Sequence, residues 1–146
     1  MKKIFISFLA IHLISLSYGY SNERKGGDIL QVALPLTAIS STWGMNDLDG
    51  FKSFMKSYLT TVSVTYLLKE GTHKRRPDGS DYLSFPSGHT SSAFSGASFV
   101  HFRYGFKYSI PLYLLASFTG YSRIESNKHY VEDVMAGAGL AIFSSW

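Results

Sequence analysis

The sequence predicts an all-α fold, a compact bundle of about five helices that follows an N-terminal signal peptide. Apolar residues recur at helical spacing in long stretches, short segments with glycine and proline separate them, and no convincing set of alternating strands is present. The 146 residues allow one domain, and a hydrophobic content of 45% is too high for a disordered chain. The absence of cysteine excludes disulfides, zinc ribbons and thiol nucleophiles.

The beginning of the chain has the pattern of an export signal. Residues 1–3 carry two lysines, residues 4–17 are uncharged and mostly apolar, and residues 17–19 place small side chains at the −3 and −1 positions of a cleavage site. The apolar segment is too short to span a membrane comfortably. We therefore expect a signal peptide at 1–19 and a single exported domain at 20–146.

Five helices are expected after this leader. Their predicted bounds are 28–41, 50–69, 87–104, 108–120 and 127–145. The predicted breaks lie at Gly26-Gly27, 44–50, 71–86, Gly105 and Gly120. No apolar stretch after the leader is long enough, without polar interruption, to require a membrane span. The sequence therefore favours a soluble or peripheral protein over an integral membrane protein.

The positive charge is concentrated in one place. The formal net charge is +4, but two of the cations lie in the leader and four more lie between Lys69 and Arg76. The rest of the chain is close to neutral. A general nucleic-acid binder needs an extended basic surface, so the sequence argues against nucleic acid as a partner. A single basic loop suits a site for one small anion.

The first polar cluster combines a lysine and an arginine. Lys69 falls at the centre of a helical stripe that includes Phe54 and Tyr58, a costly position unless an anion meets the lysine. Arg76 precedes Pro77, which holds the arginine backbone extended. An ammonium and a forked guanidinium together suit a tetrahedral oxyanion such as phosphate. The alternative is that Lys69 extends off the helix end into water.

The second cluster lies at the expected start of a helix. Ser87 is a good N-cap residue, and Gly88 lets a ligand approach the backbone closely. The free N–H groups and the dipole of a helix start form an anion site. His89 lies over the face formed by Ala93 and Gly96 of the same helix. A plain helix cap beside a surface histidine is the alternative.

The third cluster contains Arg123, His129 and Asp133. His129 and Asp133 are four residues apart, so we expect them one turn apart on the same face of one helix. A carboxylate bonded to one ring nitrogen would fix the tautomer and leave the other nitrogen as a nucleophile. An ordinary His–Asp pair on a solvated helix is the alternative.

Taken in order, the three clusters resemble the three-part signature of the type 2 phosphatidic acid phosphatase (PAP2) superfamily. This superfamily includes lipid phosphate phosphatases, bacterial class A acid phosphatases and vanadium haloperoxidases. Here the parts are residues 69–77, 86–89 and 122–133, and the residue types at their fixed spacings make chance agreement negligible. The chain ends at Trp146, soon after Asp133, so we expect a last core helix shorter than in most family members.

The resemblance implies a role for each residue. His129 is expected to attack phosphorus and form a phosphohistidine, Asp133 to orient the His129 ring, and His89 to act as general acid and then as general base. The expected phosphate-binding residues are Lys69, Arg76, Ser87, Gly88 and Arg123. Three cations and helix N–H groups would stabilise the transition state, so we expect no metal or other cofactor and inhibition by vanadate.

The expected substrate is a membrane lipid phosphate, hydrolysed in the periplasm or at the periplasmic face of a bacterial membrane, with the membrane surface as a partner. A soluble acid phosphatase of small phosphomonoesters shares the same site and is the main alternative. A vanadium haloperoxidase and a catalytically inactive binding homologue are less favoured.

Overall fold

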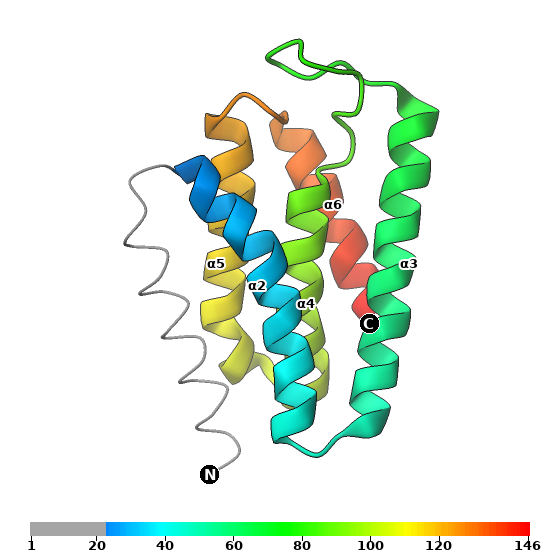
Figure 1. Ribbon diagram of the computed structural model, residues 1–146, viewed down its shortest axis with the longest axis vertical. Helices are drawn as coiled ribbons and strands as arrows, with labels where there is room; N and C mark the ends of the chain where they lie inside the picture. The colour runs from blue at the N-terminus through cyan, green and yellow to red at the C-terminus, as the bar shows by residue number, and fades with distance from the viewer. Residues whose placement is uncertain (1–22) are drawn as a thin grey trace.

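The computed structural model describes residues 23–146, so the expected signal peptide lies outside the described residues. The described chain forms five helices and no strand: α2 (Glu23–Gly44), α3 (Leu48–Thr72), α4 (Gly88–Tyr104), α5 (Phe106–Glu125) and α6 (Val131–Ser145). This confirms the predicted all-α fold. Successive helices run in opposite directions along the long axis (Figure 1). None of the described helices combines the length and the apolar character that a membrane crossing needs.

The central helix is α4, and its small side chains let the neighbouring helices come close. Ala93, Ala97 and Val100 on this helix are fully buried. At Gly96 an added Cβ atom would lie 2.3 Å from the backbone oxygen of Leu34 on α2, far inside van der Waals contact. Only glycine therefore fits where α2 crosses α4. The buried apolar core is drawn mainly from α2, α4 and α5, with Phe54 contributed by α3.

Local signals in the sequence set the ends of the helices. Asp47 caps α3 by accepting a hydrogen bond of 2.9 Å from the Gly50 N–H group. At the other end, His73 adopts a left-handed φ of 45° and its N–H donates to the Lys69 carbonyl. Ser87 caps α4, as predicted, and its Oγ accepts from the Thr90 N–H group. The loop 73–87 therefore joins two helix ends at the same pole of the bundle (Figure 1).

Two predicted helix breaks are wrong. The glycine pair at 26–27 lies inside α2, and Gly120 lies inside α5, which continues to Glu125. An added Cβ atom at Gly27 would lie 2.0 Å from Ser122 Oγ, and one at Gly120 would lie 2.7 Å from Val134 Cγ1. These glycines permit close contacts between neighbouring helices. They do not end the helices in which they lie.

Candidate active site

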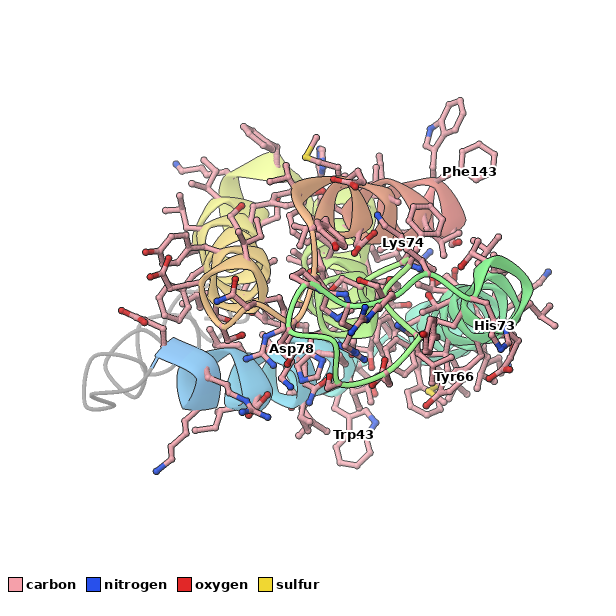
Figure 2. The ribbon with its side chains drawn as sticks, turned by 90° about the horizontal axis from the view of Figure 1, so that it is seen from above. Trp43, Tyr66, His73, Lys74, Asp78 and Phe143 are labelled. Atoms are coloured by element: carbon pink, nitrogen blue, oxygen red, sulfur yellow. The ribbon has the colours of Figure 1, made fainter. Side chains whose placement is uncertain are left out.

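The polar residues singled out in the sequence gather at one pole of the bundle. The start of α2, the end of α3, the start of α4 and the end of α5 lie there, together with the loop 73–87 and the connection 126–130 (Figure 1). Figure 2 looks down on this pole, where the loop 73–87 lies across the helix ends. In that view Lys74 lies beside α6, and Asp78 lies at the other side of the loop, near α2.

Two cavities meet at this pole. The α2–α3 cavity has a volume of about 380 Å³ and lies between α2 and α3 over the start of α4. The polar cavity, of about 260 Å³, lies between the loop 73–87, the start of α2 and the end of α5. Arg76, His89 and His129 line both cavities. Lys69 and Gly88 line only the first, and Arg123 lines only the second. The two histidines and Arg76 therefore form the junction at which one bound group would meet all three clusters.

The His129 ring is held by a backbone carbonyl. Its Nδ1 lies 2.6 Å from the Ser84 oxygen, and its Nε2 lies 3.1 Å from Nη1 of Arg76. A guanidinium only donates, so Nε2 is the acceptor and Nδ1 carries the proton that Ser84 accepts. Burial, followed by the positive charges of Arg76 and Lys69, lowers the pKa of His129 to about 3. The ring is therefore neutral, with a lone pair on Nε2, through most of the pH range.

The predicted direct pairing of His129 with Asp133 is wrong in its geometry. The last helix begins at Val131, which leaves His129 in the preceding connection and not on a shared helical face. Nδ1 lies 3.8 Å from Asp133 Oδ2, beyond hydrogen-bonding distance. Asp133 acts on the ring through its charge, while the Ser84 carbonyl fixes the tautomer.

Asp133 is fully buried and completely satisfied by other donors. It accepts from Lys74 Nζ at 2.6 Å, from Ser84 Oγ at 2.5 Å and from the Tyr130 N–H at 2.9 Å. Burial alone would raise the pKa of this carboxyl, but the hydrogen bonds from Lys74, Ser84 and Tyr130 outweigh it and lower the pKa. Asp133 is therefore ionised. The sequence reasoning did not identify Lys74 or Ser84 as parts of the site.

His89 also has a carboxylate partner that the sequence reasoning missed. Its Nε2 lies 2.9 Å from Asp28 Oδ1, and the same oxygen accepts from Arg123 Nη1 at 2.8 Å. Burial, followed by the charge of Arg123, lowers the pKa of His89 to about 4, although Asp28 opposes the shift. Asp28 reaches the site from α2, and in the sequence it was only the first residue of the helix predicted at 28–41.

The three predicted cations lie around the junction. Lys69 Nζ donates to the Leu83 carbonyl at 2.7 Å, and burial, followed by the charge of Arg76, lowers the pKa of this lysine to about 8. Arg76 donates to Asp81 at 2.6 Å, and Arg123 is only 2% exposed. Two of the cations thus bond to carboxylates, while Lys69 bonds to a neutral carbonyl. Within residues 23–146 no group of three or more acidic or histidine side chains could hold a metal ion.

Ser87 and Gly88 occupy different positions in the site. The Ser87 side chain is fully buried, accepts a hydrogen bond of 3.0 Å from Thr90 Oγ1 and lines neither cavity. It therefore fixes the start of α4. Gly88 lines the α2–α3 cavity, so the start of α4, a position that favours an anion, borders this cavity.

Comparison with known proteins places this chain in a family. The model of the PAP2 superfamily matches residues 51–146, a range that contains all eight residues predicted for the site. A lipid A 1-phosphatase of Porphyromonas gingivalis is 49% identical over 70 residues, which cover 46% of this chain and 16% of that protein. A lipid A 4'-phosphatase of Helicobacter pylori is 33% identical over 126 residues, which cover 79% of this chain and 63% of that protein. The chain thus spans less than two thirds of the length of either curated relative.

A solved structure shares the fold. The crystal structure of Aquifex aeolicus LpxE superposes with a TM-score of 0.67 and 23% identity, covering 98% of this chain and 82% of that chain. At this identity the likeness is one of fold. Since the family model matches more than half of the chain, the chain belongs to the PAP2 superfamily.

Proposed function

We propose that this protein is a phosphatase that hydrolyses phosphate monoesters through a phosphohistidine at His129. The observation that carries the proposal is the state of the His129 ring. Its Nδ1 proton is donated to Ser84, and its Nε2 lone pair is directed to the junction where Arg76 and His89 also lie. A neutral imidazole whose Nδ1 carries the proton and whose Nε2 keeps its lone pair is the form that attacks phosphorus, once a phosphoryl group replaces Nε2 as the partner of Arg76.

In the first step Nε2 of His129 attacks the phosphorus atom, and the bond from phosphorus to the ester oxygen breaks. Protonated His89 gives its proton to the departing alkoxide, which leaves as a neutral alcohol. Lys69, Arg76 and Arg123 neutralise the phosphoryl oxygens. Positioning and charge neutralisation supply most of the acceleration in phosphoryl transfer.

In the second step a water molecule attacks the phosphohistidine. Neutral His89 takes a proton from that water, the N–P bond breaks, and its electron pair returns to Nε2 of His129. Inorganic phosphate leaves, and His89 is again protonated. Asp28 supports both steps because its carboxylate holds the His89 ring and stabilises the protonated form.

We propose a lipid phosphate as the substrate. The α2–α3 cavity extends from the junction past Tyr58, Val62, Tyr66 and Leu83, so apolar and aromatic groups surround the space beside the phosphate position. An ester with a large apolar alcohol part would bury surface there, and a small phosphate would not. Two relatives are named as lipid A phosphatases, which supports the same class of substrate.

Contact with a membrane surface is part of this proposal. Large apolar side chains are exposed on α2, α3, α5 and α6, with Trp43 at 75% and Phe143 at 76% exposure. Figure 2 shows these two residues pointing away from the bundle on opposite faces. Exposed apolar surface of this extent is typical of a protein that contacts lipid or another protein. With the export signal expected at 1–19, we place the protein at the periplasmic face of a bacterial membrane.

The proposed reaction needs no metal or other cofactor. Lys69, Arg76 and Arg123, together with the N–H groups at the start of α4, supply the positive charge that a metal ion supplies in kinases. Vanadate should inhibit because it adopts the trigonal-bipyramidal geometry of the transition state and would meet the same donors.

The test is phosphate release by the full-length chain, expressed with its leader and purified in mild detergent, in the presence of EDTA. Dioctanoyl phosphatidic acid is compared with p-nitrophenyl phosphate, and His129→Ala is the blank. We expect metal-independent turnover that is lost in the variant and a higher kcat/KM for the lipid. Preference for p-nitrophenyl phosphate would favour the soluble acid phosphatase. A folded wild type without turnover would refute the enzyme.

A further inference from the structure

Lys74 is linked to the proposed nucleophile His129 through Asp133, and no step of the proposed reaction uses this lysine. Its Nζ donates to Asp133 Oδ1 at 2.6 Å and to Glu132 Oε1 at 2.8 Å. It also lies 4.5 Å above the centre of the Tyr130 ring, an additional favourable contact for a cation. The Lys74 side chain is 29% exposed, whereas that of Asp133 is completely buried. The lysine therefore lies between the buried carboxylate of Asp133 and the solvent.

Ser84 joins Lys74, Asp133 and His129 into one network. Its N–H donates to the Lys74 carbonyl at 2.9 Å, its hydroxyl donates to Asp133 at 2.5 Å, and its carbonyl accepts from His129 Nδ1 at 2.6 Å. Ser84 is fully buried. A shift of the loop at Lys74 would therefore move both the carboxylate and the ring, because one residue holds all three.

In this network both carboxylate oxygens of Asp133 accept hydrogen bonds from groups other than His129. Oδ1 faces Lys74, while Oδ2 is bonded to Ser84 and the Tyr130 N–H and lies 3.8 Å from Nδ1. Arg76 from the loop and Lys69 from α3 lower the pKa of the His129 ring, and Asp133 from α6 raises it. The other acidic, basic and histidine side chains that line the cavities with the ring are His89, Arg24, Asp28, Asp81, Arg123 and Lys128. Asp133 is the carboxylate that lies 3.8 Å from Nδ1 of His129, so a change in its effective charge acts directly on the ring.

We propose that Lys74 is a positioning residue that sets, through Asp133 and Ser84, how strongly the buried carboxylate stabilises positive charge on His129. With Lys74 in place the carboxylate is largely neutralised, and the imidazole stays a free base in a strongly cationic site. Without it, the hydrogen bonds from Ser84 and the Tyr130 N–H still lower the pKa of Asp133, and the charge of the carboxylate acts on the ring across 3.8 Å with no cation beside it. The site itself rests on the proposed function, but the effect on the ring does not depend on turnover.

The first variant is Lys74→Met, which keeps the apolar stem and removes the charge. We expect His129 to titrate about one pH unit higher than in the wild type, because an uncompensated acid favours the protonated ring. The acidic limb of the kcat/KM profile should move upward by the same amount. Lys74→Arg keeps the positive charge in place. In this variant the titration of His129 and the acidic limb of the kcat/KM profile should both stay at the wild-type pH.

The second variant is Glu132→Gln, at an exposed position that should not affect folding. It frees Lys74 from its second carboxylate, so the lysine neutralises Asp133 more completely. We expect His129 to titrate at a slightly lower pH than in the wild type, by about a few tenths of a unit. Opposite shifts in the two variants are a signature that loss of stability cannot imitate.

The measurement is a nitrogen-15 NMR titration of the histidine rings, with the pH dependence of kcat/KM recorded beside it and the melting temperature as a check of folding. No shift in Lys74→Met, or an upward or absent shift in Glu132→Gln, would overturn the proposal. If Lys74→Met does not fold, the direction in Glu132→Gln decides alone. Correct NMR shifts in a protein without turnover would refute the proposed function and leave this inference standing.

Discussion

The two poles of the bundle both carry clusters of ionised side chains, but they differ in charge balance. At the pole opposite the site, Asp47 accepts from two nitrogens of Arg103 at 2.8 and 2.7 Å, from Tyr104 and from the Gly50 N–H. One carboxylate there meets one guanidinium, and none of these residues lines either of the two site cavities. At the site pole, Lys69 has no carboxylate partner among residues 23–146, and it lines the α2–α3 cavity.

This difference separates a structural polar cluster from a site. The hydrogen bonds from Arg103 hold the pKa of Asp47 well below its usual range, and the cluster ties the α2–α3 connection to the end of α4. Its carboxylate is occupied by donors of the protein itself. The site pole places its cations around open space, where burial lowers the pKa of Lys69 and an arriving anion would relieve the mutual repulsion of Lys69 and Arg76.

The largest expected effect comes from removing the proposed nucleophile. His129→Ala should reduce kcat by about 10⁴-fold or more, because no other group in the site can form the covalent intermediate. The control is His101→Ala, because His101 is a half-buried histidine that packs against Phe102 and Tyr113 and lines neither site cavity. Steady-state turnover of p-nitrophenyl phosphate measures both variants. Equal losses would mean that the site pole has no special chemistry.

The next effect tests Asp28, the carboxylate that bonds both His89 and Arg123. Asp28→Asn should lower kcat by about 10²-fold, because His89 loses the partner that stabilises its protonated form. The fold should persist, since the Asp28 side chain is 44% exposed. Stopped assays at saturating substrate give kcat directly. A loss confined to KM would show that Asp28 serves only to bind phosphate through Arg123.

A smaller effect concerns pH. In the free protein the pKa of His89 is about 4, so the fraction of protonated general acid falls above that pH. A bound phosphoryl dianion favours the protonated ring and raises that pKa. The basic limb of the kcat profile should therefore lie at higher pH than the basic limb of kcat/KM. Profiles recorded between pH 3 and 8 on one substrate test this, and coincident limbs would contradict the assignment of His89.

The smallest effect on activity belongs to the opposite pole. Asp47→Asn should lower the free energy of unfolding by about 1 kcal/mol through the lost ion pair with Arg103, because asparagine still caps α3, and it should leave kcat unchanged. The stabilisation from a carboxyl with a lowered pKa is present above its unfolded value of 3.8 and is lost as the pH falls below that value. Urea unfolding at pH 7 and at pH 3 should therefore show a smaller difference between wild type and variant at pH 3.

The sequence predicted the parts of the site better than their connections. Lys69 lies inward as its helical spacing indicated, and Ser87 caps α4 as its residue type indicated. The direct contact of His129 with Asp133 was wrong because the helix starts two residues after the histidine, and Ser84 enters from a loop 45 residues earlier. Contacts of this kind depend on where the chain brings a distant loop, and the spacing of residues within one motif carries no information about them.

The glycine at the crossing of α2 and α4 has a consequence for ligand binding. Because Gly96 brings the Leu34 backbone against α4, the helix that presents Gly88 and His89 is held rigidly before any phosphate arrives. The donors at its start are already oriented, so binding removes little conformational entropy from the protein. Amide hydrogen exchange by local opening at the start of α4 should therefore change little when an anion binds.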